Sequence, residues 1–166
     1  MPYIFLAERI PSWKQSAGSV HKTNSEYVAS NETIPPFEME FRIHPEDIDQ
    51  LGHVGNLVYM RWVQDIAIAH WNSASTEAER DVLVWVVVRH EIDYKHSALP
   101  GDAILVRTWV GNAFGQLFER RTEIFRSNDR FLLASARTLW CPISTKTGKP
   151  TRVSDELRRR FSVSGS

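Results

Sequence analysis

One stretch of this chain has the period of a long amphipathic helix, and that stretch limits the folds open to the remainder. After Asn56 apolar residues recur every three to four positions, and the pattern ends near 73–75. This spacing gives a helix one apolar stripe. The stripe contains Val58, Val63, Ile66, Ala67 and Trp71, flanked by Tyr59, Trp62 and His70. Because the helix cannot bury this stripe by itself, the other segments must cover it.

The other periodic segments predict β-strands. From Phe37 to Ile43 apolar and polar side chains alternate, which predicts a first strand before the helix. Four more strands are predicted after the helix, separated by turns rich in Gly, Asn and Asp. These strands cover 82–94, 103–110, 117–126 and 131–143. Ser154 is expected to cap a short terminal helix that runs through Arg160.

This order predicts an α+β fold in which an antiparallel five-stranded sheet wraps around one long central helix, with a short C-terminal helix. The four later strands are expected to follow one another as a meander. The apolar run Val82–Val88 is expected to be buried on both faces, whereas 117–125 alternates and predicts one covered and one partly wet face. Since an open sheet leaves edge strands, we expect edge pairing in a homodimer or homotetramer.

Length and composition predict one folded domain over 36–166. The chain has 166 residues, and 42% of them are hydrophobic, enough for one sizeable core. Residues 1–35 are polar, lack a sustained period and stop at Pro35-Pro36. We interpret them as an N-terminal extension that is either poorly ordered or packed on a partner subunit.

Charge and cysteine content exclude several classes. Lys plus Arg and Asp plus Glu both number 20, so no overall field attracts nucleic acid or an anionic membrane. Cys141 is the only cysteine, which excludes an internal disulfide framework and paired-thiolate zinc sites and favours a reducing, cytoplasmic setting. No apolar run is long enough for a signal peptide or a membrane span.

The segment Pro45–Asn56, between the first strand and the helix, concentrates reactive side chains. It contains Asp47, Asp49 and His53 together with two glycines. Carboxylates before a helix lie near its unpaired backbone N–H groups, which can stabilise an oxyanion. An aspartate can attack a carbonyl or activate water. This combination is typical of acyl transfer.

The same segment resembles a known active-site loop. The pattern Asp-x-Asp-x-x-Gly-x-Val starting at Asp47, followed by Tyr59 and Arg61-Trp62, resembles the loop of hot-dog thioesterases of the 4-hydroxybenzoyl-CoA thioesterase type. The run 52–54 and Asn56 also resemble the loop of long-chain acyl-CoA and plant acyl-ACP thioesterases. The likeness extends over about 37–161, and it implies a hot-dog fold and hydrolysis of an acyl-CoA to free acid and CoA.

The resemblance assigns roles residue by residue. It implies that Asp49 is the nucleophile or general base, that Asp47 is secondary, and that the backbone N–H groups near Asn56 and Leu57 bind the oxyanion. The implied catalytic residues are Asp49, Asn56 and His53. The implied substrate-binding residues are Gly52, Val54, Leu57 and Tyr59. Relatives often carry Glu-Glu where this chain has Gln64-Asp65, and this departure argues against Asp65 as a second catalytic group.

Several alternatives remain open at the level of sequence. A hot-dog acyl-thioester hydratase or dehydratase and a non-catalytic acyl-binding module share the expected fold. The acyl group, the choice between CoA and acyl carrier protein, and attack by Asp49 as opposed to water activation are also undecided. No metal site is predicted because the histidines lack ligand spacing, and no cofactor is expected beyond the CoA of the substrate. The basic residues considered for CoA are Arg89, His90, Lys95, His96, Arg120, Arg121 and Arg126.

Overall fold

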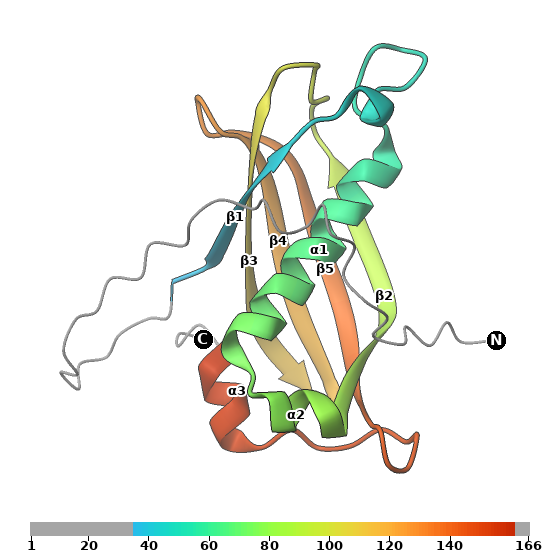
Figure 1. The fold of residues 1–166 in the computed structure, drawn as a ribbon, viewed down its shortest axis with the longest axis vertical. Helices are drawn as coiled ribbons and strands as arrows, with labels where there is room; N and C mark the ends of the chain where they lie inside the picture. Colours follow the sequence, from blue (N-terminus) through green and yellow to red (C-terminus); the bar gives the residue numbers. More distant parts are fainter. Residues whose placement is uncertain (1–34, 162–166) are drawn as a thin grey trace, which may run out of the picture. The chain divides into compact units, whose positions relative to one another are not determined.

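The computed structural model describes residues 35–161, in which five antiparallel strands form one sheet. The predicted extension over 1–35 lies almost wholly outside the described residues. The sheet order is β1-β3-β4-β5-β2, and α1 crosses one face of the sheet (Figure 1). The strands are β1 (Phe37–Arg42), β2 (Leu83–Tyr94), β3 (Ala103–Phe114), β4 (Leu117–Arg126) and β5 (Phe131–Ser144). The predicted antiparallel sheet with one long helix is confirmed.

One long helix and three short ones complete the described chain. The long helix is α1 (Asn56–Ala74), and the turn η2 (Pro45–Asp47) precedes it. α2 (Glu77–Val82) and α3 (Asp155–Phe161) lie at the opposite end of the sheet from η2 (Figure 1). Ser154 caps α3 as predicted, because its Oγ accepts the Leu157 N–H at 3.2 Å. None of the helices in residues 35–161 has the length and apolar character that crossing a membrane requires.

The apolar stripe of α1 packs against the inner face of the sheet and forms the main core. Trp62 and Ile66 on α1 are 1% and 0% exposed, and Ile104, Val106 and Ile124 on the facing strands are 0% exposed. Burying one such side chain stabilises the fold by about 1.5–3 kcal/mol. Ile66→Ala would therefore cost about 2–5 kcal/mol, because a cavity adds to the lost burial. The core fixes the axis of α1 and with it the position of its first turn.

A buried polar pair interrupts this core beside the C-terminal half of α1. The Arg120 Nη1 donates to His70 Nδ1 at 3.0 Å and to Thr108 Oγ1 at 3.2 Å. Because a guanidinium can only donate, His70 Nδ1 accepts and the imidazole is neutral. Burial, together with the Arg120 charge, lowers the pKa of His70 to about 3. The ring of His70 also stacks on Phe37 at 5.0 Å, so His70 is a core residue with satisfied contacts.

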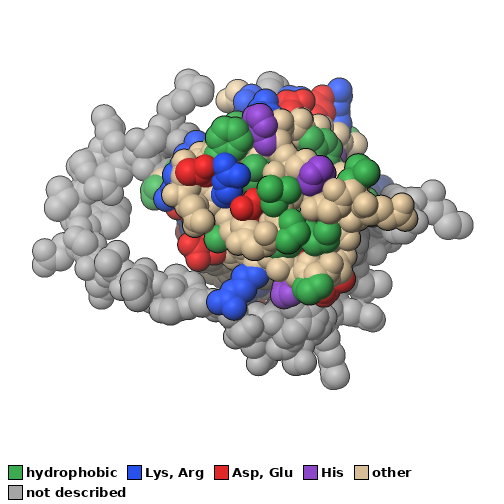
Figure 2. Space-filling model, turned by 90° about the horizontal axis from the view of Figure 1, so that it is seen from above, with side chains coloured by type: hydrophobic (Ala, Val, Ile, Leu, Met, Phe, Trp, Pro, Cys, Tyr) green, Lys and Arg blue, Asp and Glu red, His purple; other side chains and the backbone are tan. Residues whose placement is uncertain are grey.

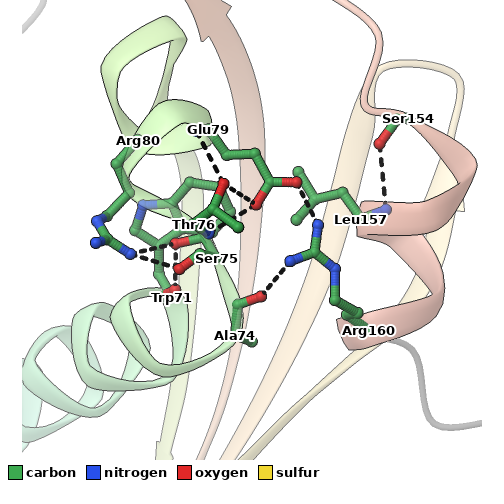
Figure 3. Close-up of polar contacts among 9 residues, drawn as sticks. All are labelled: Trp71, Ala74, Ser75, Thr76, Glu79, Arg80, Ser154, Leu157 and Arg160. Carbon is green, nitrogen blue, oxygen red and sulfur yellow. Dashed lines mark hydrogen bonds and ion pairs between the residues drawn. The ribbon is translucent and has the colours of Figure 1, made fainter.

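Side-chain contacts tie the C-terminal end of α1 to α2 and α3 (Figure 3). Arg160 on α3 donates to the Ala74 carbonyl at 2.8 Å and forms a short ion pair with Glu79 on α2. Arg80 donates to the Ser75 carbonyl at 2.5 Å. The hydrogen bond from Arg160 is the main reason that the pKa of Glu79 falls to about 2. These contacts satisfy carbonyls that the end of a helix leaves unpaired.

The structure corrects the predicted strand order and one burial prediction. β2 pairs with β5 instead of preceding β3 in a meander, so β1 and β2 are the two edges. The prediction that Val82–Val88 is buried on both faces is wrong for this chain, since Val88 is 57% exposed and Val82 is 61% exposed. Among residues 35–161 β2 has one strand neighbour, and its register shifts between Val87 and Arg89. An edge position with a bulge turns apolar side chains outward.

Two element boundaries also differ from the prediction. β3 continues past its predicted end at Val110, because a register shift between Val110 and Ala113 accommodates Gly111 and Asn112. α2 was not predicted, although its start carries a readable signal. Thr76 accepts the Glu79 N–H at 3.2 Å while Glu79 accepts the Thr76 N–H at 2.7 Å, which is a reciprocal capping box.

Candidate active site

The loop before α1 begins with a buried, ion-paired carboxylate. Asp47 is 3% exposed, and its Oδ1 accepts from Arg61 Nη2 at 2.7 Å. Its Oδ2 accepts the His44 N–H at 2.9 Å. The Asp47 carbonyl accepts the N–H of Gly55, the residue before α1, at 2.9 Å. Asp47 therefore links η2, the second turn of α1 and the start of that helix.

Asp49 is the exposed aspartate of the loop and closes a tight turn. Its Oδ1 accepts the N–H groups of Leu51 at 2.8 Å and His53 at 3.3 Å. Its backbone N–H donates to the His53 carbonyl at 2.7 Å, and its carbonyl accepts the Gly52 N–H at 3.0 Å. Gly52 has φ +77°, which favours glycine at this position. Within residues 35–161 no hydrogen-bond donor reaches Asp49 Oδ2, which leaves one carboxylate oxygen available for chemistry.

A second contact holds the far side of this turn. Val54 is buried, and its N–H donates to the Ala98 carbonyl at 3.0 Å. The Ala98 N–H donates to the Tyr59 hydroxyl at 2.7 Å. Tyr59 is itself 3% exposed, and burial is the main cause of its raised pKa. The predicted substrate-binding residues Val54 and Tyr59 therefore support the loop in this structure.

The first turn of α1 faces outward with unpaired donors. Gly55 is the N-cap and provides no side-chain cap, and the first turn contains no acidic residue. Among residues 35–161 the N–H groups of Asn56 and Leu57 have no acceptor. A Cβ placed on Gly55 would lie 3.9 Å from the Asp49 Cβ, so the Asp49 side chain begins beside this helix end. Unpaired N–H groups at a helix start favour an anion or a developing oxyanion.

Apolar side chains surround this end of the molecule. Viewed from above, hydrophobic, charged and histidine side chains are interleaved there (Figure 2). Five of the exposed large hydrophobic residues lie on segments that meet at this end. They are Leu51 (79% exposed), Leu57 (77%), Tyr94 (49%), Leu99 (43%) and Phe131 (42%). Such a grouping is typical of a surface that binds an apolar ligand or another protein.

The structure brings most of the predicted site residues together. Asp49, Gly52 and His53 share one turn, and Asn56 and Leu57 begin the adjacent helix. His53 is half-buried, and within the described residues no side-chain hydrogen bond fixes its ring. Sequence reasoning missed the contribution of Arg61 and Ala98. Arg61 was visible as part of the motif, but its pairing with Asp47 depends on how the loop folds back on α1.

Five of the seven residues considered for CoA are already engaged with other side chains. Arg89 pairs with Glu91, His90 with Thr138 and Arg126 with Asp129. Arg120 is buried in the core and so cannot serve as a rim cation. The Nε of Arg121 donates to Glu119 at 2.7 Å, on the sheet face opposite α1. A groove of about 490 Å³ opens on that face, and none of its lining residues belongs to the loop before α1. In the described part of the chain, no three His, Cys, Asp or Glu side chains are arranged to hold a metal ion.

The architecture belongs to a known class. A 1,4-dihydroxy-2-naphthoyl-CoA thioesterase from Synechocystis superposes with a TM-score of 0.66 at 21% identity, covering 76% of this chain and 95% of that chain. A thioesterase from Thermus thermophilus, solved with coenzyme A and zinc, gives a TM-score of 0.64 at 21% identity, covering 75% and 90%. At this identity the likeness shows the fold, which is the hot-dog fold of thioesterases.

The family follows from the sequence match. The model of the thioesterase-like superfamily matches residues 43–161, and the chain belongs to this superfamily. A chloroplastic acyl-[acyl-carrier-protein] hydrolase from Cuphea viscosissima is 25% identical over 134 residues, covering 75% of this chain and 32% of the relative. The chain thus spans about a third or less of the length of the curated relatives that it matches.

Proposed function

We propose that this protein hydrolyses an acyl-CoA thioester to the free acid and CoA, with Asp49 as its catalytic carboxylate. The observation that carries the proposal is the free Asp49 Oδ2 beside the unpaired N–H groups of Asn56 and Leu57. A thioester carbonyl bound at these N–H groups would be polarised where the tetrahedral intermediate develops negative charge. Asp49 would then attack the carbonyl carbon or remove a proton from the attacking water.

The two roles of Asp49 differ in their covalent course. Attack by Asp49 displaces CoA thiolate and forms a mixed anhydride, which water then hydrolyses. Water activation transfers one proton to Asp49 and forms no covalent species. A single turnover in H₂¹⁸O tests for the anhydride route, because label appears in Asp49 only if an anhydride forms and water attacks it at the enzyme carbonyl.

The carrier is part of the proposal. The 1,4-dihydroxy-2-naphthoyl-CoA thioesterase acts on a CoA ester, whereas the Cuphea relative acts on acyl carrier protein. We propose CoA, because a chain with equal numbers of acidic and basic residues has no overall basic field to attract an acidic carrier protein. Assaying the same acyl group on both carriers tests this choice, and faster turnover on acyl carrier protein would contradict it.

We further propose that the working form is a homodimer or homotetramer that pairs through β2. β2 is an edge strand of 12 residues with exposed Val87 and Val88. Long apolar edges are normally covered, and a second copy supplies a matching edge. Sedimentation of wild type and Val88→Lys would test this, since the variant should shift towards monomer.

Thiol release from a panel of acyl-CoAs of rising chain length tests the catalytic proposal. We expect Asp49→Asn to lower kcat by about 10²–10⁴ while acyl-CoA binding persists. Glu46→Gln is the matched control, because Glu46 is an exposed carboxylate of the same loop. Unchanged turnover in Asp49→Asn would remove Asp49 from the chemistry. Absence of thiol release by the wild type would favour a hydratase or a binding module.

A further inference from the structure

Two aspartates of the loop, Asp47 and Asp49, lie two positions apart but in opposite environments. The Asp47 side chain is 1% exposed and bonded through both carboxylate oxygens. Asp49 is exposed and has one oxygen without a donor in the described chain. Because the Asp47 carboxylate is buried, substrate cannot reach its oxygens, so any contribution of Asp47 must act through other groups.

The contacts of Asp47 lead to Asp49 by two short routes. Along the backbone, Asp47 is followed by Ile48, which bridges to Val54 and so closes the turn that contains Asp49. Across the loop, the Asp47 carbonyl accepts the Gly55 N–H at 2.9 Å. A Cβ placed on Gly55 would lie 3.7 Å from that carbonyl oxygen and 3.9 Å from the Asp49 Cβ. A displacement of Asp47 would therefore displace both the turn that contains Asp49 and Gly55, the residue before α1.

Arg61 fixes this arrangement to the long helix. Its Nη2 bonds Asp47 Oδ1 at 2.7 Å from the second turn of α1, while the rest of its side chain is 44% exposed. The axis of α1 is fixed by the core. The ion pair thus connects the loop to the most firmly packed element. The contact through Ala98 and Tyr59 holds the other side of the turn and does not involve Asp47.

We infer that Asp47 and Arg61 form a clamp that positions Asp49 against the first turn of α1, which makes both positioning residues of the site. The inference rests on the proposed role of Asp49. Efficient attack requires reacting groups to be held within a fraction of an ångström, and a displacement of about 1 Å can cost about 10² in rate. The clamp supplies this restraint through charge and hydrogen bonding, without contact to substrate.

Three variants separate the clamp from simple stability. Asp47→Asn keeps an oxygen for the His44 N–H but presents the rest of its amide to Arg61 without charge. We expect kcat to fall about 10–100-fold while KM changes less than about threefold and the protein stays folded. Arg61→Gln leaves the buried Asp47 carboxylate without its ion-pair partner, so kcat of this variant should fall at least as far. The double variant Asp47→Asn with Arg61→Gln can form a neutral amide pair and should recover part of kcat, with Glu46→Gln as the unchanged control.

Amide hydrogen exchange gives a readout that does not depend on turnover. The N–H groups of Leu51 and His53 are protected by Asp49 Oδ1, so a loosened clamp should increase their exchange rates in Asp47→Asn. The amides of Ile104 and Ile124 in the core should not change. If Leu51 and His53 exchange faster in Asp47→Asn but the wild-type protein shows no thioesterase activity, the clamp is supported and the proposed function is contradicted. Unchanged exchange, unchanged kcat, or losses that multiply in the double variant would overturn the clamp.

Discussion

The two ends of α1 differ in whether other residues hydrogen-bond the backbone groups that a helix end leaves unpaired. At the C-terminal end, side chains from α2 and α3 satisfy the last carbonyls, including those of Ala74 and Ser75. At the N-terminal end, the N-cap is a glycine without a side chain, and the N–H groups of Asn56 and Leu57 have no acceptor in the described chain. Capping a helix end stabilises it, and these two N–H groups are the donors that the proposed site would use for the thioester carbonyl.

The environments of the two ends differ as well. The C-terminal end is covered by a small core that includes Leu83, Phe118 and Phe161. The N-terminal end is rimmed by exposed Leu51 and Leu57. The C-terminal end of the helix therefore contributes stability, and the N-terminal end carries the exposed groups that the proposed site would use.

The largest effect is expected from removing one N–H donor at the N-terminal end of α1, which we call the open end. Asn56→Pro deletes the Asn56 N–H, and the ring suits the first helical position because Gly55 is extended, with φ −64° and ψ 146°. We expect kcat about 10²-fold below that of Asn56→Ala, which loses the side chain but keeps the N–H. Steady-state kinetics of the two variants test this. Equal kcat values would mean that this N–H does not contact the reacting carbonyl.

The C-terminal end of α1, which we call the closed end, should lose stability in acid because of His70. Its folded pKa, about 3, lies below the ordinary 6.5, so as pH falls below about 6.5 the unfolded chain binds a proton that the folded chain does not. Stability attributable to this group is present above pH 6.5 and should fall by about 2 kcal/mol by pH 5. Urea unfolding of wild type and His70→Gln across this range measures the difference. Because burial also lowers the pKa of His90, a residual slope should persist in the variant.

Removing a contact at the closed end should affect stability and spare catalysis. Arg160→Met deletes the hydrogen bond to the Ala74 carbonyl and the ion pair with Glu79. We expect the thermal midpoint to fall by about 3–6 °C, with kcat and KM unchanged within about twofold. Calorimetry and thiol-release kinetics on one preparation measure both effects. A loss of kcat larger than the loss of folded protein would show that the two ends are coupled.

The sequence predicted the helices and strands better than it predicted which strands pair with each other. The stripe of α1 and the alternation in 117–125 arise from local periodicity, and the structure confirms both. The place of β2 beside β5 depends on a long-range pairing that leaves no local trace, so the burial prediction for Val82–Val88 was wrong. An apolar run reads the same whether its own sheet or a second subunit covers it.

The candidate site shows the same division. Asp49, His53 and Asn56 were identified from a motif of adjacent residues, and their catalytic roles stay predictions. The pairing of Asp47 with Arg61 and of Tyr59 with Ala98 could not be read from the sequence, because each joins segments 14 or 39 positions apart. Spacing identifies reactive side chains, whereas only the folded loop distinguishes the exposed aspartate from the buried one.

The most direct test of the open helix end is to follow backbone ¹⁵N and amide proton shifts while a non-hydrolysable acyl-CoA analogue is added. We predict the largest changes at Asn56 and Leu57 and in the Asp49 turn, with Ser75 and Thr76 at the other end of α1 unchanged. Saturable binding that leaves Asn56 and Leu57 unshifted would contradict the claim that the first turn of α1 receives the thioester carbonyl.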